Sequence, residues 1–117
     1  MITVYGIKNC DTVKKALKWL AEHHIEHQLH DYRTDGLTRA WLVEAENRFG
    51  WQNLVNKRST TWRHLDQQVK ETLSKQTALE QLLAQPTLIK RPIILQGNIA
   101  LIGFDEQAYA AALTQGE

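Results

Sequence analysis

The fold of this chain is decided near its N-terminus, where residues 2–20 read ITVYGIKNCDTVKKALKWL. Residues 2–6 are mostly β-branched or aromatic, which predicts a strand. Apolar side chains then recur with the spacing of one helix face, i, i+3, i+4 and i+7. These side chains are Val13, Ala16, Leu17 and Leu20. A short polar loop joins the two elements, so Cys10 is predicted to lie at the start of the helix.

The rest of the chain continues this pattern of alternating elements. Residues 26–33 are predicted to form a second strand and to complete a βαβ unit. Two apolar strands near the C-terminus, residues 92–96 and 99–102, are separated by Gly97-Asn98, a two-residue loop typical of a hairpin. We therefore predict an α/β fold in which a mixed four-stranded sheet is flanked by helices.

Residues 38–86, between the second and third strands, are predicted to form a helical insertion. Thr38 is a candidate N-cap for its first helix, and residues 77–80 read as a capping box that starts its last one. Three apolar side chains with i, i+4 and i+8 spacing share one further helix face: Leu65, Val69 and Leu73. After the hairpin, Asp105 is expected to cap a C-terminal helix.

Length, charge and cysteine count narrow the class of protein. The chain has 117 residues, which is the size of one domain, so residues 1–117 are expected to form a single domain. Its formal net charge of +1 makes nucleic acid an unlikely partner, and we expect no membrane association. One cysteine excludes an internal disulfide and fits a reducing compartment. We expect a cytoplasmic protein, taken as a monomer.

Cys10 is the candidate for chemistry because of its expected place at a helix start. Free amide N–H groups and the positive end of the helix macrodipole favour a thiolate there, and Lys8 and Lys14 add positive charge nearby. The alternative is a small buried hydrophobe, which many free cysteines are. Val13 stands where a Cys-x-x-Cys motif would have its second thiol, so any turnover must use an outside thiol such as glutathione.

Two segments carry a resemblance to a known family. Residues 5–16, YGIKNCDTVKKA, resemble the active-site start of the glutaredoxin-coupled arsenate reductase (ArsC) family, and residues 88–94, LIKRPII, are similar to its Arg-Pro strand entry. Residues 103–106, GFDE, look more like the Spx-type relatives. The pattern looks closest to the YffB-like subgroup.

The resemblance implies a thioredoxin-like fold with a nucleophilic thiolate at Cys10. It also implies an anion-binding guanidinium at Arg91 and a cis peptide bond before Pro92. Where the family's middle and last arginines are expected, this sequence has Asn56 and Gly103. Arg58 lies two residues after the first of these positions.

The candidate site therefore has two catalytic residues and a wider binding shell. The catalytic residues are Cys10 and Arg91. The residues expected to bind substrate or glutathione are Lys8, Asn9, Asp11, Thr12, Lys14, Arg58 and Pro92. No bound cofactor is expected. The histidines at positions 23, 24, 27 and 30 straddle a helix end and a strand, so they are not expected to converge on a metal ion, and no metal site is expected.

Three functions follow from these residues. The first is a glutathione-dependent thiol/disulfide reductase that uses Cys10 and is recycled by glutathione or glutaredoxin. The second is arsenate reduction proper, with an oxyanion as substrate. The third is a regulator of the Spx type that binds RNA polymerase and has no enzymatic activity.

Overall fold

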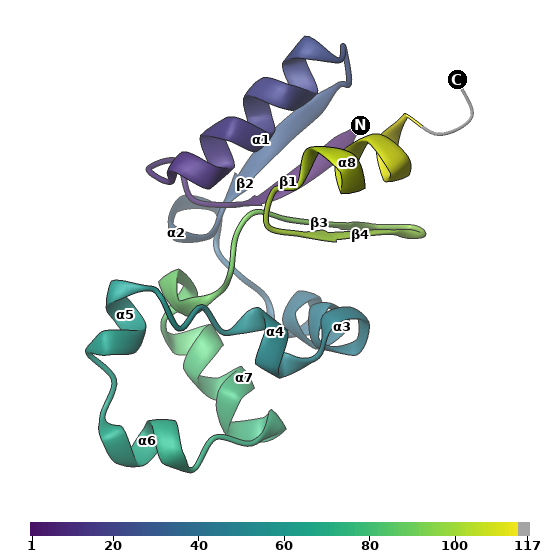
Figure 1. Ribbon diagram of the computed structural model, residues 1–117. Coiled ribbons are helices and arrows are strands. Elements are labelled where there is room, and N and C mark those ends of the chain that lie inside the picture. The colour runs from purple at the N-terminus through teal and green to yellow at the C-terminus, as the bar shows by residue number, and fades with distance from the viewer. Residues whose placement is uncertain (115–117) are drawn as a thin grey trace. The chain divides into compact units, whose positions relative to one another are not determined.

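The computed structural model describes residues 1–114, and its strands gather into one sheet (Figure 1). The strands are β1 (Ile2–Gly6), β2 (His27–Asp31), β3 (Ile93–Gln96) and β4 (Ile99–Ile102), in the order β2-β1-β3-β4. β1 runs parallel to β2, whereas β1–β3 and β3–β4 are antiparallel. The predicted mixed four-stranded sheet and the C-terminal hairpin are therefore confirmed.

Two helices cover one face of this sheet, α1 (Asp11–Glu22) and α8 (Glu106–Leu113) (Figure 1). The Asp105 side chain accepts hydrogen bonds from the backbone N–H groups of Gln107 and Ala108, as an N-cap should. The rings of Trp19 and Tyr109 meet edge to face, with centroids 5.6 Å apart. The core between helices and sheet consists of Val4, Ala16, Trp19, Leu20, Ile94, Leu101 and Tyr109.

The chain divides into two compact units, described separately below. The sheet unit comprises residues 1–35 and the C-terminal segment that begins at Arg91, and it includes the short helix α2 (Tyr32–Asp35). The helical unit is Gly36–Lys90, which lies between the second and third strands, where the insertion is predicted. That all of residues 1–117 act as a single domain stays a prediction.

The helical unit consists of short helices. They are α3 (Arg39–Phe49), α4 (Trp51–Leu54), α5 (Thr60–Arg63), α6 (Gln67–Glu71), α7 (Lys75–Ala84) and the 3₁₀ helix η1 (Pro86–Leu88). Helix α3 packs against α4 and α7. An isolated antiparallel bridge between Val55 and Ile89 ties the middle of the unit to its end. No helix within residues 1–114 combines the length and the apolar character needed to cross a bilayer.

Local polar contacts decide where several elements begin, and some predicted bounds are wrong for that reason. The second strand ends at Asp31, because its carboxylate accepts the Arg33 N–H and starts α2. The predicted cap at Thr38 is confirmed, since its hydroxyl accepts the Trp41 N–H. The capping box begins at Ser74 rather than at residue 77.

The predicted single face of Leu65, Val69 and Leu73 is also wrong, because these residues do not share one helix. Helix α5 ends before Leu65, and the Asp66 side chain accepts the Gln68 N–H and starts α6. An aspartate in the middle of an apolar repeat acts as an N-cap, which outweighs the repeat.

Candidate active site around Cys10

Strand register brings three separate segments to one end of the sheet. Gly6, the last residue of β1, pairs with Asp31, the last residue of the parallel strand β2. Tyr5 pairs with Ile93 at the start of the antiparallel strand β3, so Arg91 and Pro92 enter the sheet beside the end of β1. The loop that carries Cys10 leaves β1 at this same end. The register therefore gathers the residues before and after Cys10, Asp31 and Arg91 in one region of the sheet unit.

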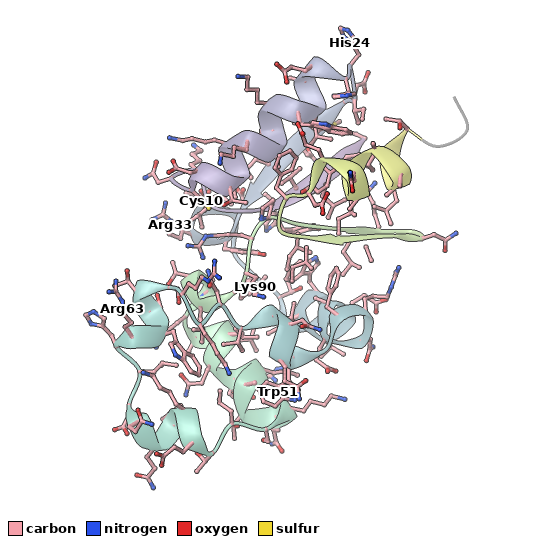
Figure 2. All side chains as sticks on the ribbon, viewed as in Figure 1. Cys10, His24, Arg33, Trp51, Arg63 and Lys90 are labelled. Carbon is pink, nitrogen blue, oxygen red and sulfur yellow. The ribbon has the colours of Figure 1, made fainter. Side chains whose placement is uncertain are left out.

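Cys10 is the N-cap residue of α1 (Figure 2). Its backbone is extended, with φ −137° and ψ 121°, and its carbonyl accepts the first helical hydrogen bond from the Lys14 N–H at 2.9 Å. The side chain is half-buried and makes no capping hydrogen bond, and the thiol is free. The N–H groups of the first turn have no partner within the helix, so they and the macrodipole favour an anion beside this sulfur.

Gly6 permits the close approach of α1 to the strand end. A Cβ atom at this position would lie 2.8 Å from Val13 Cγ2 and 3.6 Å from Arg91 Cβ. The first distance is far below van der Waals contact, and Val13 is fully buried and β-branched, so it cannot swing away. A glycine here thus lets the first turn of α1 and the backbone of Arg91 close on β1 from two sides.

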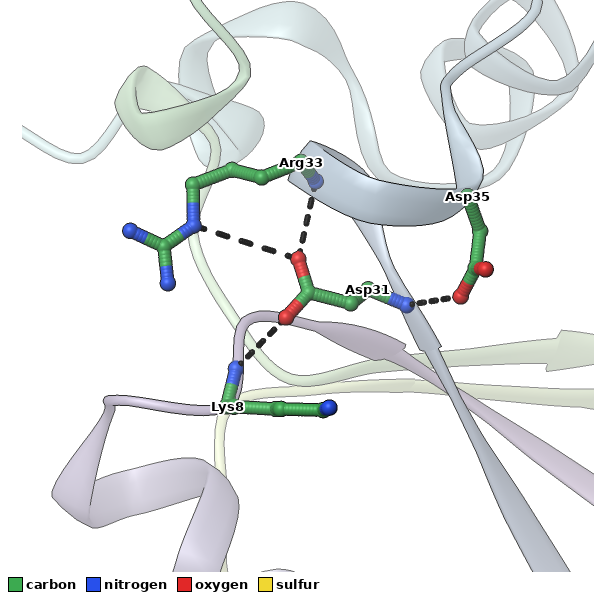
Figure 3. A network of polar contacts seen from close by, with 4 residues as sticks. All are labelled: Lys8, Asp31, Arg33 and Asp35. Atoms are coloured by element: carbon green, nitrogen blue, oxygen red, sulfur yellow. Dashed lines mark hydrogen bonds and ion pairs between the residues drawn. The ribbon is translucent and has the colours of Figure 1, made fainter.

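Asp31 holds the cysteine loop through its buried carboxylate (Figure 3). One oxygen, Oδ2, accepts the Lys8 backbone N–H at 2.9 Å, and Oδ1 accepts the Arg33 N–H at 2.8 Å. The Arg33 Nε atom lies 3.9 Å from Oδ1, and the Asp35 carboxylate accepts the Asp31 N–H at 2.9 Å. The residue is only 2% exposed. This carboxylate therefore fixes the loop two residues before Cys10.

The charge of Asp31 is stabilised by these contacts. Burial alone would raise the pKa of the Asp31 carboxyl group, but the hydrogen bonds from the Arg33 and Lys8 backbone and the Arg33 charge outweigh burial and lower it. A lowered folded-state pKa means that the folded protein favours the ionised form. Its stabilising effect is complete above the unfolded-state pKa and is lost as the pH falls through the folded-state value.

Replacement of Asp31 by asparagine should therefore give a pH-dependent loss of stability. An amide offers one acceptor oxygen where the carboxylate uses two, so one backbone N–H loses its partner. We expect the free energy of unfolding at pH 7 to fall by about 1–3 kcal/mol. The difference from wild type should start to shrink as the pH falls below about 4, where the Asp31 carboxyl group of the unfolded chain takes up a proton. It should shrink further as the pH passes through the lower folded-state pKa.

Urea unfolding of both proteins across this pH range measures the difference. The exposed carboxylate of Glu44 provides a control, because Glu44→Gln should change stability little at any pH. An Asp31→Asn deficit that stayed constant down to low pH would show that the charge is not the cause.

Arg91 and Tyr32 lie close enough to interact electrostatically. Burial raises the pKa of the Tyr32 hydroxyl, and the positive charge of Arg91 opposes that rise. Tyr32 is 2% exposed, so its hydroxyl stays protonated at neutral pH. The peptide bond between Arg91 and Pro92 is cis, as the resemblance implies, and the Pro92 carbonyl accepts the Gly103 N–H at 2.8 Å.

Several known proteins resemble this chain over most of its length. The sequence model described as the ArsC family matches residues 5–112. The chain belongs to the ArsC family. An uncharacterised protein of Haemophilus influenzae is 71% identical over 112 residues, which cover 96% of this chain and 98% of that protein. The global transcriptional regulator Spx of Streptococcus pyogenes serotype M3 is 31% identical over 119 residues, covering 98% of this chain and 87% of Spx.

Solved structures of similar proteins share this fold. A protein named YffB (PA3664) superposes with a TM-score of 0.91 at 45% identity, over 97% of this chain and 99% of that one. The predicted thioredoxin-like fold of the ArsC type, with helices between its second and third strands, is therefore confirmed.

The family's arginine positions fall in different parts of this ArsC-family chain. Gly103, where the last arginine is expected, donates its N–H to Pro92 in the sheet unit and has open space around its Cα. Asn56, where the middle arginine is expected, belongs to the helical unit, and its side-chain oxygen accepts the Arg58 N–H at 3.0 Å. Arg58 is exposed. Its role at the thiol stays a prediction.

The remaining predicted site residues surround Cys10 along the chain and are solvent-accessible, apart from Pro92. The exposed ones in the sheet unit are Lys8, Asn9, Asp11, Thr12 and Lys14. Pro92 is fully buried under the entry to β3. Lys8 contributes through its backbone N–H, which the sequence does not reveal. Within residues 1–114, no cluster of three or more His, Cys, Asp or Glu side chains could hold a metal ion.

Sequence reasoning missed three residues at this site: Gly6, Asp31 and Tyr32. The sequence predicts a strand that continues to residue 33, so Asp31 is assigned to the interior of that strand. One available signal was an acidic residue followed by Tyr-Arg-Thr-Asp, because aspartate often starts a helix.

Proposed function

We propose that this protein is a cytoplasmic, monomeric, glutathione-dependent thiol/disulfide reductase with Cys10 as its nucleophile. The proposal rests on one observation: Cys10, whose thiol is free, is the N-cap residue of α1 at the sheet end where Arg91 enters. A thiolate is the reactive form of cysteine, and a helix N-terminus favours it. A guanidinium at the same end would bind the carboxylates of glutathione.

The proposed cycle is two thiol–disulfide exchanges. The Cys10 thiolate attacks the glutathione sulfur of a mixed disulfide between glutathione and a substrate thiol. A bond forms between Cys10 Sγ and that sulfur, the old S–S bond breaks, and the substrate leaves as a thiolate that takes up a proton. A second glutathione thiolate then attacks the glutathione on Cys10. Glutathione disulfide is released and the Cys10 thiolate returns.

The other predicted residues have supporting roles in this proposal. Lys8 and Lys14 would attract the anionic substrate. The backbone around Asn9, Asp11 and Thr12 would line the sulfur. Cis-Pro92 would form the opposite wall.

Formation of a glutathione adduct tests the proposal directly. Folded protein mixed with glutathione disulfide should gain one glutathione by intact mass, and added glutathione should remove it. Arg91→Met should slow adduct formation about tenfold or more, because it removes a charge-assisted contact to the substrate carboxylate. With hydroxyethyl disulfide, which is uncharged, the same variant should react at nearly the wild-type rate.

Lys18→Met is the matched control, since Lys18 is an exposed cation on the same helix as the thiol. It should slow neither reaction appreciably. Failure of the folded protein to form an adduct, with labelling only after unfolding, would make Cys10 a structural residue and would end the proposal.

Arsenate reduction is less well supported than thiol exchange. A tetrahedral dianion is held best by several charge-assisted contacts. Of the three positions at which the family places arginines, this chain retains only Arg91, with Asn56 and Gly103 at the others. Arsenate turnover above the level of a Cys10→Ser blank, with glutathione and glutaredoxin present, would reverse this ranking.

A second candidate function is transcriptional regulation, and the resemblance to Spx favours it. Spx of Streptococcus pyogenes matches 98% of this chain. A regulator that binds RNA polymerase would not need its thiol. Recovery of polymerase subunits from a lysate by both wild type and Cys10→Ser would support this function.

A further inference from the structure

The helical unit contains a pocket of about 190 Å³ that the proposed thiol chemistry does not use. Trp51 of α4 and Trp62 of α5 form part of its apolar wall. The rest of the apolar wall comes from Val55, which follows α4, and Leu73, which lies between α6 and α7. Trp51 is labelled in Figure 2. An engineered cavity of about 150 Å³ is enough to bind benzene, so this pocket has room for one aromatic ring with a small substituent.

Two cations face the same aromatic wall of this pocket. Lys57 Nζ lies 5.6 Å from the centroid of the Trp62 ring, and Lys70 Nζ lies 5.3 Å from it. Both lysines also line the pocket. Contact with the face of an indole ring restrains each ammonium group, so both charges are held in place before any ligand arrives.

Within residues 1–114, no ion pair neutralises these two charges. In the portion of the chain that the structure describes, neither lysine has a carboxylate within ion-pair distance. The neighbouring acids make other contacts: Asp66 accepts the Gln68 N–H, and Glu71 accepts from the Gln67 amide at 3.2 Å. Both ammonium groups lie within 5.6 Å of the same ring centroid, so an anion beside that ring would be attracted by each of them.

We propose that this pocket binds a small aromatic carboxylate. The ring would pack against the two indole groups, and the carboxylate would sit between Lys57 and Lys70. Stacked aromatic pairs are more stable than the area they bury accounts for, which favours a flat ring over an aliphatic chain of equal size. A lysine ammonium group is a point charge and, unlike arginine, does not fix the orientation of a carboxylate. The pocket would therefore recognise an aromatic ring and a negative charge without requiring one orientation of the carboxylate.

Benzoate is the probe for this proposal, and the four tryptophans provide the readout. In an NMR titration, the indole N–H signals of Trp51 and Trp62 should shift, while those of Trp19 and Trp41 should not, because these two do not line the pocket. For a ligand of this size we expect a Kd of about 1 mM or tighter. Benzamide tests the need for charge and acetate the need for the ring, and each should bind at least about tenfold more weakly.

Substitution of each lysine tests the geometry. Lys57→Met and Lys70→Met retain the apolar stem over Trp62 but remove the charge, and each should weaken benzoate about tenfold or more. Lys75→Met is the matched control, because this lysine belongs to the same unit but pairs with Glu46 at 3.4 Å. It should bind benzoate as wild type does.

Several results would overturn the proposal. Trp51 and Trp62 signals that do not move in millimolar benzoate would show that the pocket is not a binding site. If benzamide bound as tightly as benzoate, the negative charge would not be needed for binding, and if acetate did so, the ring would not be needed. Unchanged affinity for benzoate in both lysine variants would show that the two cations do not bind the ligand. None of these measurements requires a reactive Cys10, so they are independent of the proposed reductase activity.

Discussion

Cys10→Ser is expected to abolish reduction of glutathione mixed disulfides, with a loss of at least about 10³-fold, the order seen when a nucleophile is removed. A serine hydroxyl is almost fully protonated at neutral pH, and no base is invoked in the proposed cycle to activate it. The chain has no second cysteine to substitute for it. The measurement is the steady-state rate of glutathione disulfide release. Added glutathione reductase reduces the disulfide with NADPH, and the consumption of NADPH is followed.

The same substitution should leave the protein folded, which makes the result easy to interpret. Cys10 occupies the N-cap of α1 without a side-chain hydrogen bond, and serine is among the best N-cap residues. The unfolding midpoint in urea should therefore be equal to that of wild type or slightly higher. Full activity in a folded Cys10→Ser protein would remove the thiol from the mechanism altogether.

Gly6→Ala should destabilise the fold through a steric clash at the end of β1. The added methyl group would lie 2.8 Å from Val13 Cγ2. Neither this methyl group nor the Val13 side chain could move away, because both positions are buried where α1 packs against β1. Overpacking of this kind costs about 1–3 kcal/mol. Urea unfolding at constant pH measures the loss. The reaction of Cys10 with iodoacetamide should also change, because α1 must shift away from the strand end.

A double-mutant cycle separates this clash from other effects of alanine. Val13→Ala alone should destabilise by about 2 kcal/mol, since it removes two buried methyl groups. In the Gly6→Ala/Val13→Ala protein, the new methyl fills space that the valine has vacated. The double variant should therefore be more stable than the sum of the single losses predicts. Strict additivity would contradict the contact between these two positions.

The elements with strong local signals were predictable from the sequence. The strand at 2–6 was predicted from its β-branched and aromatic residues, the hairpin from the turn residues around Gly97, and the last helix start from the capping aspartate Asp105. Each of these is a local property. The helical unit was harder, because polar caps interrupt its apolar repeats. Asp66 stops one pattern and starts a new helix, whereas the repeat predicts continuity.

At the candidate site, the sequence reveals the cysteine but not what surrounds it. Cys10 and Arg91 are visible as motifs because their neighbours in the chain are distinctive. The contact from Asp31 to the Lys8 N–H depends on the parallel register of β1 and β2, which pairs residues 25 positions apart. The Gly6 contact depends on the packing depth of α1. No local sequence pattern determines the strand register or the distance between α1 and β1, so these contacts could be identified only from the structure.

In the proposed cycle, the fully buried valine at position 13 would also affect the kinetics of recovery after oxidation. A second cysteine in the same chain would resolve an oxidised Cys10 at a fixed effective concentration, whatever the state of the surroundings. With a valine there, the rate of return to the thiol form would be first order in the outside thiol. The fraction of the protein carrying an adduct would then follow the cell's supply of that thiol, rising when it is depleted and falling when it is restored.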